Sequence, residues 1–234
     1  MNKTIVLIGT YNEQENLAAL VGEILALNAG LDILVIDDNS PDGTGRLADE
    51  LAAAHPEVTV LHRPGKMGLG TAYVAGFRRA LEHGYDRIVT MDADFSHEPG
   101  RLPGFLAAFA THDVVVGTRY MKGGGVVNWP PHRLILSRGG SIYTRLVTGM
   151  PLRDATGGFN AYRREVLETI NLDSIRSEGY AFQIEMKFRA WKRGFRIAEM
   201  PIVFADRTRG KSKMSRRIFL EAIFTVWKMR FSSR

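Results

Sequence analysis

Short apolar runs alternate with helix-patterned segments throughout the first half of this chain. The runs are rich in Val and Ile, and the segments between them repeat apolar residues three and four positions apart. The pattern predicts strands over 4–8, 33–36, 58–61, 87–91 and 113–117, and helices over 13–27, 44–54, 69–83 and 99–110. Strands separated by helices of this length predict a parallel α/β sheet with right-handed connections.

The second half has a looser pattern. It predicts a flexible Gly-rich loop over 122–131, helices over 134–147 and 179–193, a strand within 195–204 and an apolar helix over 218–231. We therefore expect one α/β domain over residues 1–213 and an amphipathic helix within 214–234. No segment reaches the roughly 18 uncharged apolar residues of a membrane-spanning helix. The amino terminus lacks a signal peptide's apolar run, so a cytoplasmic location is expected.

Composition excludes several other classes of protein. With 45% hydrophobic and 24% charged residues, the 234-residue chain can bury a core and is not a disordered protein. It has no cysteine, which excludes disulfides, zinc-thiolate sites and cysteine nucleophiles.

Charge is divided unevenly along the chain. Residues 1–117 carry 8 Lys/Arg against 16 Asp/Glu, whereas residues 118–234 carry 23 against 9. Six cations occupy eleven positions: Arg207, Arg209, Lys211, Lys213, Arg216 and Arg217. A solvated basic loop explains such a run, and so does a loop that binds phosphate oxygens. Aromatic residues do not interleave with these cations as a stacking surface requires, so we do not expect nucleic acid as a partner.

Polar clusters follow the carboxyl ends of three predicted strands. They are Tyr11-Asn12-Glu13, Asp37-Asp38 and Asp92-Ala93-Asp94. Ligands of open α/β sheets bind at this edge. The two carboxylates of the third cluster suit a hard divalent cation that keeps substrate phosphates in its shell, although acidic turns are also common at strand ends. An ordinary turn and helix cap explains residues 39–44 but leaves Asp37 unexplained.

In their order along the chain, these and further motifs resemble the polyprenyl- and dolichyl-phosphate mannose synthases of glycosyltransferase family 2. The matching strings are GTYNE, VIDDNSPDGT, GLGTAYVAGF, MDADFSHEP, VVGTRY, DATGGF, GYAFQIE and DRTRGKSKMS. The resemblance runs in order from about residue 4 to residue 217, and MDADFSH together with R-x-x-G-x-SKM is typical of the polyprenyl-phosphate branch. The resemblance implies an inverting GT-A catalytic domain. Such a domain has a Rossmann-like, mostly parallel central sheet with flanking helices, here followed by a C-terminal amphipathic helix.

The resemblance also implies roles for individual residues. The nucleotide and donor pocket would contain Gly9, Tyr11, Glu13, Val35, Asp37, Asp92, Ala93, Asp94, Arg207 and Lys213. The ligands of Mg²⁺ or Mn²⁺ would be Asp94, Asp92 and Ser96. The acceptor phosphate would contact Arg119, Arg133, Ser137 and Arg138. The catalytic set would be Asp94, Arg119, Arg207, Lys213 and Asp154. Gly9 and Ser96 replace a proline and a glutamine of relatives.

The implied reaction moves mannose from GDP-mannose to a polyprenyl monophosphate with inversion. A phosphate monoester has a second pKa of about 6, so the acceptor is largely dianionic at neutral pH and hardly needs a general base. We therefore expect Asp154 to orient the donor sugar. Residues 218–231 are expected to bind an anionic membrane surface on its cytosolic face, with or without a small membrane-anchoring subunit. Packing of this helix on the domain is the alternative.

Three other functions compete with this reading. A sister enzyme would deliver glucose from UDP-glucose, or another sugar, to polyprenyl phosphate. A nucleotidyltransferase would share the α/β sheet and acidic metal site, but would carry a Gly-rich basic signature after the first strand, where Tyr11-Asn12-Glu13 stands. A non-enzymatic module that binds anions is disfavoured because Asp37, Asp92 and Asp94 would repel phosphate without a metal.

Overall fold

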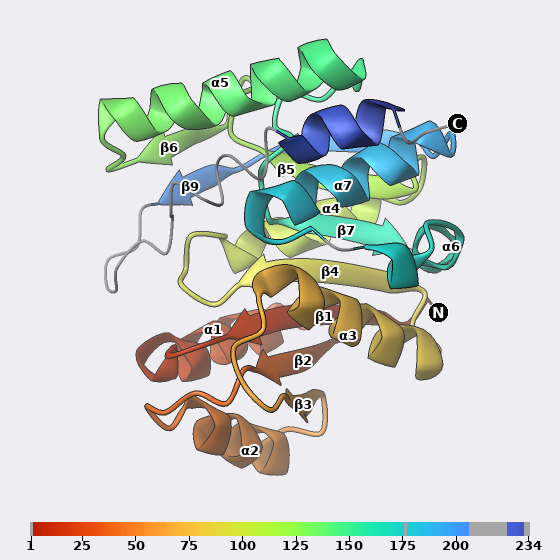
Figure 1. The fold of residues 1–234 in the computed structure, drawn as a ribbon. Coiled ribbons are helices and arrows are strands. Elements are labelled where there is room, and N and C mark those ends of the chain that lie inside the picture. Colours follow the sequence, from red (N-terminus) through yellow and green to blue (C-terminus); the bar gives the residue numbers. More distant parts are fainter. Residues whose placement is uncertain (1, 176, 206–223, 232–234) are drawn as a thin grey trace.

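The computed structural model describes residues 2–175, 177–205 and 224–231. Figure 1 shows a central sheet with helices on both faces. Its seven strands run in the order β3-β2-β1-β4-β7-β5-β8. Their bounds are β1 (Thr4–Thr10), β2 (Leu31–Asp37), β3 (Val58–His62), β4 (Arg87–Asp92), β5 (Val114–Thr118), β7 (Asn160–Arg163) and β8 (Ile197–Pro201). A second, two-stranded sheet pairs β6 (Gly125–Val127) with β9 (Val203–Ala205).

The predicted mostly parallel sheet is confirmed, and one of its strands is antiparallel. β7 runs antiparallel to both of its neighbours, β4 and β5. Its four residues are too few to show a period along the sequence, and it leads directly into the next helix. The long connection between β5 and β7 therefore leaves the sheet and re-enters it at the same edge, where Val116 near the end of β5 pairs with Asn160 at the start of β7.

The helices flank the sheet, and most match their predicted positions. Their bounds are α1 (Gln14–Ala26), α2 (Thr44–Ala54), α3 (Leu69–Glu82), α4 (Leu102–Ala108), α5 (Pro131–Thr148), α6 (Arg164–Thr169) and α7 (Gly179–Lys192). Short 3-10 turns cover Pro99–Arg101 and Leu172–Ser174. The predicted helix over 99–110 therefore begins as a 3-10 turn. Residues 224–231 are also helical.

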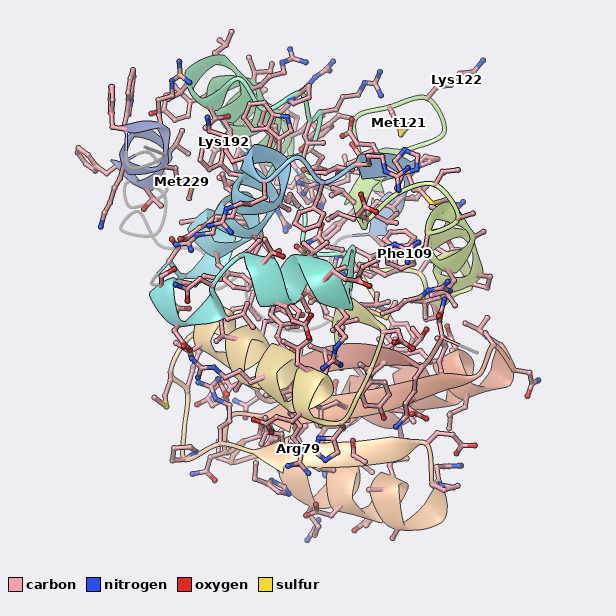
Figure 2. All side chains as sticks on the ribbon, turned by 90° about the vertical axis from the view of Figure 1, so that its right-hand side faces the viewer. Arg79, Phe109, Met121, Lys122, Lys192 and Met229 are labelled. Atoms are coloured by element: carbon pink, nitrogen blue, oxygen red, sulfur yellow. The ribbon has the colours of Figure 1, made fainter. Side chains whose placement is uncertain are left out.

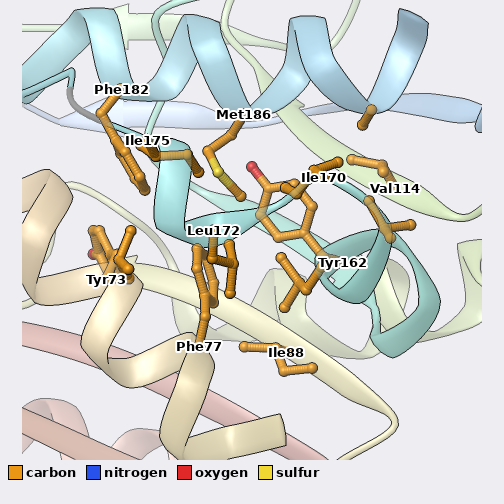
Figure 3. Packing of buried hydrophobic residues seen from close by; sticks show 14 of the residues in the cluster. Tyr73, Phe77, Ile88, Val114, Tyr162, Ile170, Leu172, Ile175, Phe182 and Met186 are labelled. Atoms are coloured by element: carbon orange, nitrogen blue, oxygen red, sulfur yellow. The ribbon is translucent and has the colours of Figure 1, made fainter. Parts of the chain in front are cut away.

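Alternate residues of β1 face two separate hydrophobic cores. Ile5 and Leu7 join the core that includes residues of α3, α6 and α7, whereas Val6 and Ile8 join the one beneath α1 and α4. Figure 3 shows the first core, where Phe77 of α3 and Met186 of α7 approach Tyr162 of β7. Each fully buried side chain of this size contributes about 1.5–3 kcal/mol, so both helix layers are firmly attached to the sheet.

The predicted flexible loop over 122–131 is more ordered than expected. Its centre forms β6, which pairs with β9. Gly124 packs so closely on the end of β5 that an added Cβ would lie 2.7 Å from the Thr118 carbonyl oxygen. The next helix begins three residues earlier than predicted because Pro131 fits the first helical turn.

The end of the described chain lies beside α5, as Figures 1 and 2 show from two directions. Val226 and Met229 of helix 224–231 are buried in the first core. Phe224, Trp227 and Phe231 remain exposed. The helix thus packs on the domain through one side and presents an apolar side outward. The predicted boundary at residues 213–214 and the first part of the predicted helix lie outside the described residues.

Candidate functional site

Three central strands bring predicted site residues to one edge of the sheet. In the parallel register of β1, Thr10 pairs with Asp37 on β2 and Gly9 pairs with Asp92 on β4. The loop after β1 therefore begins between two acidic strand ends. Parallel strands place their carboxyl ends at the same edge, which is where ligands of such sheets bind.

The turn that follows β2 holds the loop that follows β1. Ser40 Oγ and Thr44 Oγ1 accept hydrogen bonds from the backbone N–H groups of Asn12 and Glu13, at 3.1 and 3.0 Å. Asp42 accepts from the N–H of Thr44 at 3.0 Å, which is a turn contact just before α2, whose N-cap residue is Gly43. The turn therefore has a structural role, which the sequence predicted. It also fixes the predicted nucleotide-contacting loop.

Asp37 is almost wholly buried and strongly hydrogen-bonded. Its Oδ1 accepts from Ser40 Oγ at 2.6 Å and from Thr10 Oγ1 at 3.1 Å, and its Oδ2 accepts from the Ser40 N–H at 3.1 Å. The carboxylate is therefore held at the end of β2. In the loop after β1, the centroid of the Tyr11 ring lies 4.4 Å from Lys66 Nζ. Val35 is fully buried in the core beneath this end of the sheet.

The Asp92-Ala93-Asp94 segment forms a tight turn after β4. Asp94 is nearly buried, and its Oδ1 accepts a hydrogen bond from the Ser96 N–H at 3.1 Å. The Asp92 N–H donates to His97 Nδ1 at 3.0 Å, which leaves the proton of a neutral His97 on Nε2. Burial lowers the pKa of His97, so the ring is neutral at pH 7. It stacks on Phe159 with a centroid distance of 5.0 Å.

The donor set of this turn suits a hard divalent cation. Asp92 and Asp94 supply carboxylate oxygens, and Ser96 Oγ is a buried hydroxyl with no hydrogen-bond partner among the described residues. Within residues 2–175, 177–205 and 224–231, no group of three or more His, Cys, Asp or Glu side chains could hold a metal ion. This turn offers two carboxylates and one hydroxyl, so Mg²⁺ or Mn²⁺ held there would take further oxygens from elsewhere, as Mg²⁺ commonly does from water and substrate phosphates.

A buried ion pair lies on the other side of this edge, after β5. Arg119 Nε and Nη2 donate to the two carboxylate oxygens of Asp154 at 2.6 and 2.7 Å, and the Arg119 backbone N–H adds a third bond at 3.1 Å. Their side chains are 4% and 0% exposed. Burial alone would raise the pKa of Asp154, but the charge and hydrogen bonds of Arg119 hold it below its usual value. Both groups are therefore ionised at neutral pH.

Three aromatic rings surround the Arg119 guanidinium. Its Cζ lies 5.1 Å from the Tyr120 ring centroid, 5.2 Å from that of Trp129 and 5.5 Å from that of Phe204. These rings come from the end of β5, the loop before α5 and β9. The small sheet β6–β9 thus has a clear function: it brings Trp129 and Phe204 together around one cation, an arrangement that stabilises positive charge.

The predicted acceptor-phosphate residues lie at the start of α5. Arg133 also lies against the Trp129 ring, with Cζ 4.1 Å from its centroid. Ser137 Oγ accepts a hydrogen bond from the Tyr120 hydroxyl at 2.8 Å. Arg138 is exposed. Shared aromatic partners therefore connect Arg133 and Ser137 to Arg119. Arg207 and Lys213 lie outside the described residues.

The chain matches the description "Glycosyl transferase family 2" over residues 5–170. This match covers more than half of the chain. The protein belongs to glycosyltransferase family 2. The acidic turn, the buried arginine and the ordered loops after β1 and β2 are thus parts of a glycosyltransferase, and the expectation of a glycosyltransferase is confirmed.

Two curated relatives of this glycosyltransferase are similar over nearly their whole length. One is the undecaprenyl-phosphate mannosyltransferase of Micrococcus luteus, 48% identical over 232 residues, which cover 99% of this chain and 96% of that protein. The other is the polyprenol monophosphomannose synthase of Mycolicibacterium smegmatis, 50% identical over 232 residues, which cover 97% and 88%. The resemblance to polyprenyl-phosphate mannose synthases is therefore confirmed.

Solved structures support the GT-A fold of the glycosyltransferase. A mycobacterial protein has a TM-score of 0.71 at 18% identity, covering 96% of this chain and 75% of its own. Mannosyl-3-phosphoglycerate synthase from Rubrobacter xylanophilus has 0.65 at 20%, covering 97% and 73%. The mannosyltransferase PcManGT from Pyrobaculum calidifontis, solved with GDP-Man and Mn²⁺, has 0.58 at 16%, covering 99% and 73%. At these identities the likeness concerns the fold alone.

Sequence reasoning missed several side chains that surround Arg119. Trp129 lies in the predicted loop over 122–131 and Tyr120 in the motif VVGTRY, and the sequence predicts no role for Phe204 or Lys187. Lys187 lies on α7 between Ile184 and Ala190, which are both buried. A lysine within a buried helical face is the signal that could have drawn attention to it. The aromatic cluster gives no such signal because its members are far apart along the chain.

Proposed function

We propose that this glycosyltransferase transfers mannose from GDP-mannose to a polyprenyl monophosphate with inversion, giving a β-linked mannosyl phosphate and GDP. Two features support this proposal. The relatives at 48% and 50% identity are named for mannose transfer to polyprenyl phosphates or for its product. The site also opposes an acidic turn to a buried, permanently charged arginine, which suits a reaction between a nucleotide sugar and a phosphate acceptor. The buried, charged Arg119 is the structural observation that supports the proposal most directly.

Donor binding is assigned to the acidic half of the site. Tyr11, Glu13 and the buried Asp37 would contact the nucleoside, with Gly9 giving the backbone room to approach. Asp92 and Asp94 would hold Mg²⁺ or Mn²⁺ beside Ala93, with Ser96 close by. The cation, when bound, would neutralise charge that develops on the leaving diphosphate. Among residues outside the described part, Arg207 and Lys213 would contribute further positive charge to the diphosphate.

Acceptor binding is assigned to the basic half of the site. Arg119, Arg133, Ser137 and Arg138 would hold the lipid phosphate so that one of its oxygens attacks the anomeric carbon. The acceptor is already largely dianionic at pH 7, so we assign no general base. Asp154 has its carboxylate oxygens on Arg119. We therefore propose that Asp154 acts by orienting Arg119 toward the acceptor phosphate.

The proposal is tested by offering labelled GDP-mannose and labelled UDP-glucose to the protein, each with a polyprenyl phosphate and Mg²⁺. We expect mannose in the butanol-extractable lipid and loss of this product in the variant Asp94→Ala or after chelation by EDTA. Mn²⁺ or Mg²⁺ should restore the chelated enzyme. Glu98→Ala is the matched control, because Glu98 follows the same turn but pairs with Arg101 at the surface.

Each other outcome has a distinct meaning. Label from UDP-glucose alone would overturn the donor and keep the reaction type. Transfer that survives EDTA and Asp94→Ala would overturn the metal site. No transfer from either donor, with a polyprenyl phosphate in detergent, would contradict the assignment unless a small membrane-anchoring subunit restored it.

We further propose that the enzyme docks on the cytosolic face of an anionic membrane through α5 and helix 224–231. No helix within the described residues is both long and apolar enough to span a membrane. Both elements expose apolar side chains on neighbouring surfaces: Ile135, Leu136, Ile142, Leu146, Phe224, Trp227 and Phe231. Arg138, Arg145, Lys228 and Arg230 accompany them as exposed cations. Apolar residues with a basic rim suit the interface of anionic lipid.

Flotation with vesicles of phosphatidylglycerol and phosphatidylcholine tests the docking surface. The double variant Phe224→Glu, Trp227→Glu should lose flotation. Arg79→Glu is the control, because it also changes the net charge by two units but lies at the opposite end of the molecule from Met229 (Figure 2). Equal flotation of the double variant and the wild type would refute docking through helix 224–231.

A further inference from the structure

Lys187 of α7 is a fully buried cation directly beneath the segment that carries Asp154. Its Nζ donates to the carbonyl oxygen of Gly157 at 2.7 Å, of Ala155 at 3.1 Å and of Asp154 at 3.4 Å. An ammonium group has three N–H donors, and here each has a carbonyl within reach. One side chain therefore holds three peptide groups of a single turn.

The turn that Lys187 holds is the one that orients Arg119. Asp154 places both carboxylate oxygens on the guanidinium, and its Oδ1 also accepts from the Gly157 N–H at 3.2 Å. Thr156 Oγ1 of the same turn accepts from Arg119 Nη2 at 2.9 Å. The contacts run from α7 through the backbone of residues 154–157 to the cation that lies after β5. A shift of this backbone would move the guanidinium.

Lys187 also adds charge to this region. The charged groups that face it are Asp154, Arg119 and Glu199, the last on β8. Glu199 Oε1 holds the other side of the same segment, accepting from the Asp154 N–H at 3.2 Å. Burial lowers the pKa of Lys187 to about 7, opposed by the attraction of Asp154 and reinforced by the repulsion of Arg119. The ammonium therefore titrates near neutral pH.

We propose that Lys187 is a positioning residue for the phosphate-binding guanidinium of Arg119, acting through the carbonyl groups of residues 154–157. This inference rests on the proposed function, which assigns phosphate binding to Arg119. In its charged form Lys187 donates to all three carbonyl groups and adds a positive charge behind Asp154. The neutral amine has two N–H donors and no charge, so both the hydrogen bonding and the positive potential at Asp154 are weaker.

The test compares Lys187→Met with Lys192→Met, the same substitution at an exposed position of the same helix. Transfer kinetics are measured between pH 6 and 9. At pH 6.5 we expect Lys187→Met to lower kcat/KM about 10–100-fold, because misplacement of a positioned group by about 1 Å can cost as much as 100-fold. In wild type, kcat/KM should fall as the pH rises above about 7. Lys187→Met should lack that fall, and Lys192→Met should match wild type.

A second readout needs no turnover. Binding of inorganic pyrophosphate is measured by calorimetry at pH 6 and pH 8.5 for wild type and Lys187→Met. At each pH the wild-type affinity is divided by that of Lys187→Met, which cancels the titration of pyrophosphate itself. We expect wild type to bind pyrophosphate about tenfold more tightly than Lys187→Met at pH 6, and this ratio to be smaller at pH 8.5. Because this readout uses neither mannose nor lipid, it tests Lys187 even if the proposed donor or acceptor is wrong.

The outcomes separate a positioning role from a structural one. A folded Lys187→Met protein with wild-type kcat/KM, wild-type pyrophosphate affinity or the same alkaline fall would overturn the inference. A variant whose only defect is a lower unfolding temperature would do so as well, because activity at 15 °C would then equal that of wild type. If Lys187→Met does not fold, the titration of wild-type pyrophosphate binding decides. A change with apparent pKa near 7 beyond that of pyrophosphate supports the inference, and its lack overturns it.

Discussion

Two buried arginine–aspartate pairs lie at opposite ends of the ligand-binding edge, and the pKa values of their aspartates are shifted in opposite directions. Arg63 and Asp38 lie beyond β3 and β2, whereas Arg119 and Asp154 lie near β5 and β7. The pKa of Asp38 is raised and that of Asp154 is lowered. Burial alone therefore does not decide the charge state of these carboxyl groups.

The difference lies in the number of hydrogen bonds that each carboxylate receives. Arg63 donates through Nη1 to Asp38 at 2.6 Å, and its Nη2 is directed to Thr71. Arg119 donates three times to Asp154, and Lys187 adds a second cation nearby. Desolvation favours the neutral acid, and several charge-assisted bonds favour the ion. Arg119 and Asp154 therefore stay ionised together, whereas Arg63 stabilises the ionised form of Asp38 less strongly.

The largest expected effect is at the Arg119 pair. Asp154→Ala leaves a buried guanidinium without its carboxylate, so the free energy of unfolding should fall by about 3–5 kcal/mol. Asp154→Asn keeps the shape of the side chain, so it should lower the free energy of unfolding by less, but it should still lower mannose transfer. Urea denaturation followed by circular dichroism measures the change. A loss below about 1 kcal/mol would mean that the pair does not organise this region.

Arg63→Met should have a smaller effect on the free energy of unfolding. Asp38 already has a raised pKa, so it can take up a proton once its partner is removed, and the loss should be about 1–3 kcal/mol. The double variant Arg63→Met, Asp38→Asn should recover part of it. If Arg63→Met costs more than Asp154→Ala, the contrast between the two pairs is incorrect.

The pH dependence of stability should differ in sign between the two aspartates. Asp154 has a lowered pKa, so its contribution is present above about pH 4 and is lost as the pH falls through its folded-state pKa. Asp38 has a raised pKa, so its contribution is greatest below about pH 4 and declines as the pH rises. Urea midpoints from pH 3 to pH 6 should show a flatter acid limb for Asp154→Asn and a steeper one for Asp38→Asn. Equal slopes in both variants would refute this.

The smallest effect is expected at a surface pair. Arg46 and Glu50 of α2 approach to 3.8 Å with side chains that are 77% and 65% exposed. Arg46→Ala should therefore change the unfolding free energy by less than about 0.5 kcal/mol. The same urea measurement provides the baseline for the buried pairs, and a larger loss would show that charge pairs here act regardless of burial.

Much of the acidic half of the site followed from the sequence. Asp37, Asp92 and Asp94 each follow a predicted strand, so their meeting at one edge could be inferred from the parallel α/β pattern alone. The contacts within the basic half of the site could not be inferred from this pattern. Arg119 and Asp154 are 35 positions apart, and β7, which returns the chain to the sheet between β4 and β5, has too few residues to show a period. The predicted roles of the site residues remain predictions.

The sequence by itself therefore determined the alternation of strands and helices, the acidic edge and membership of a glycosyltransferase family. These depend on local periodicity and on motifs that are continuous along the chain. Only the tertiary structure decided that β7 is antiparallel, that Trp129 and Phe204 enclose Arg119, and that Lys187 lies beneath its partner. Each of these depends on contacts between distant segments, and burial together with the charges and hydrogen bonds at such contacts sets both the charge state and the orientation of a side chain.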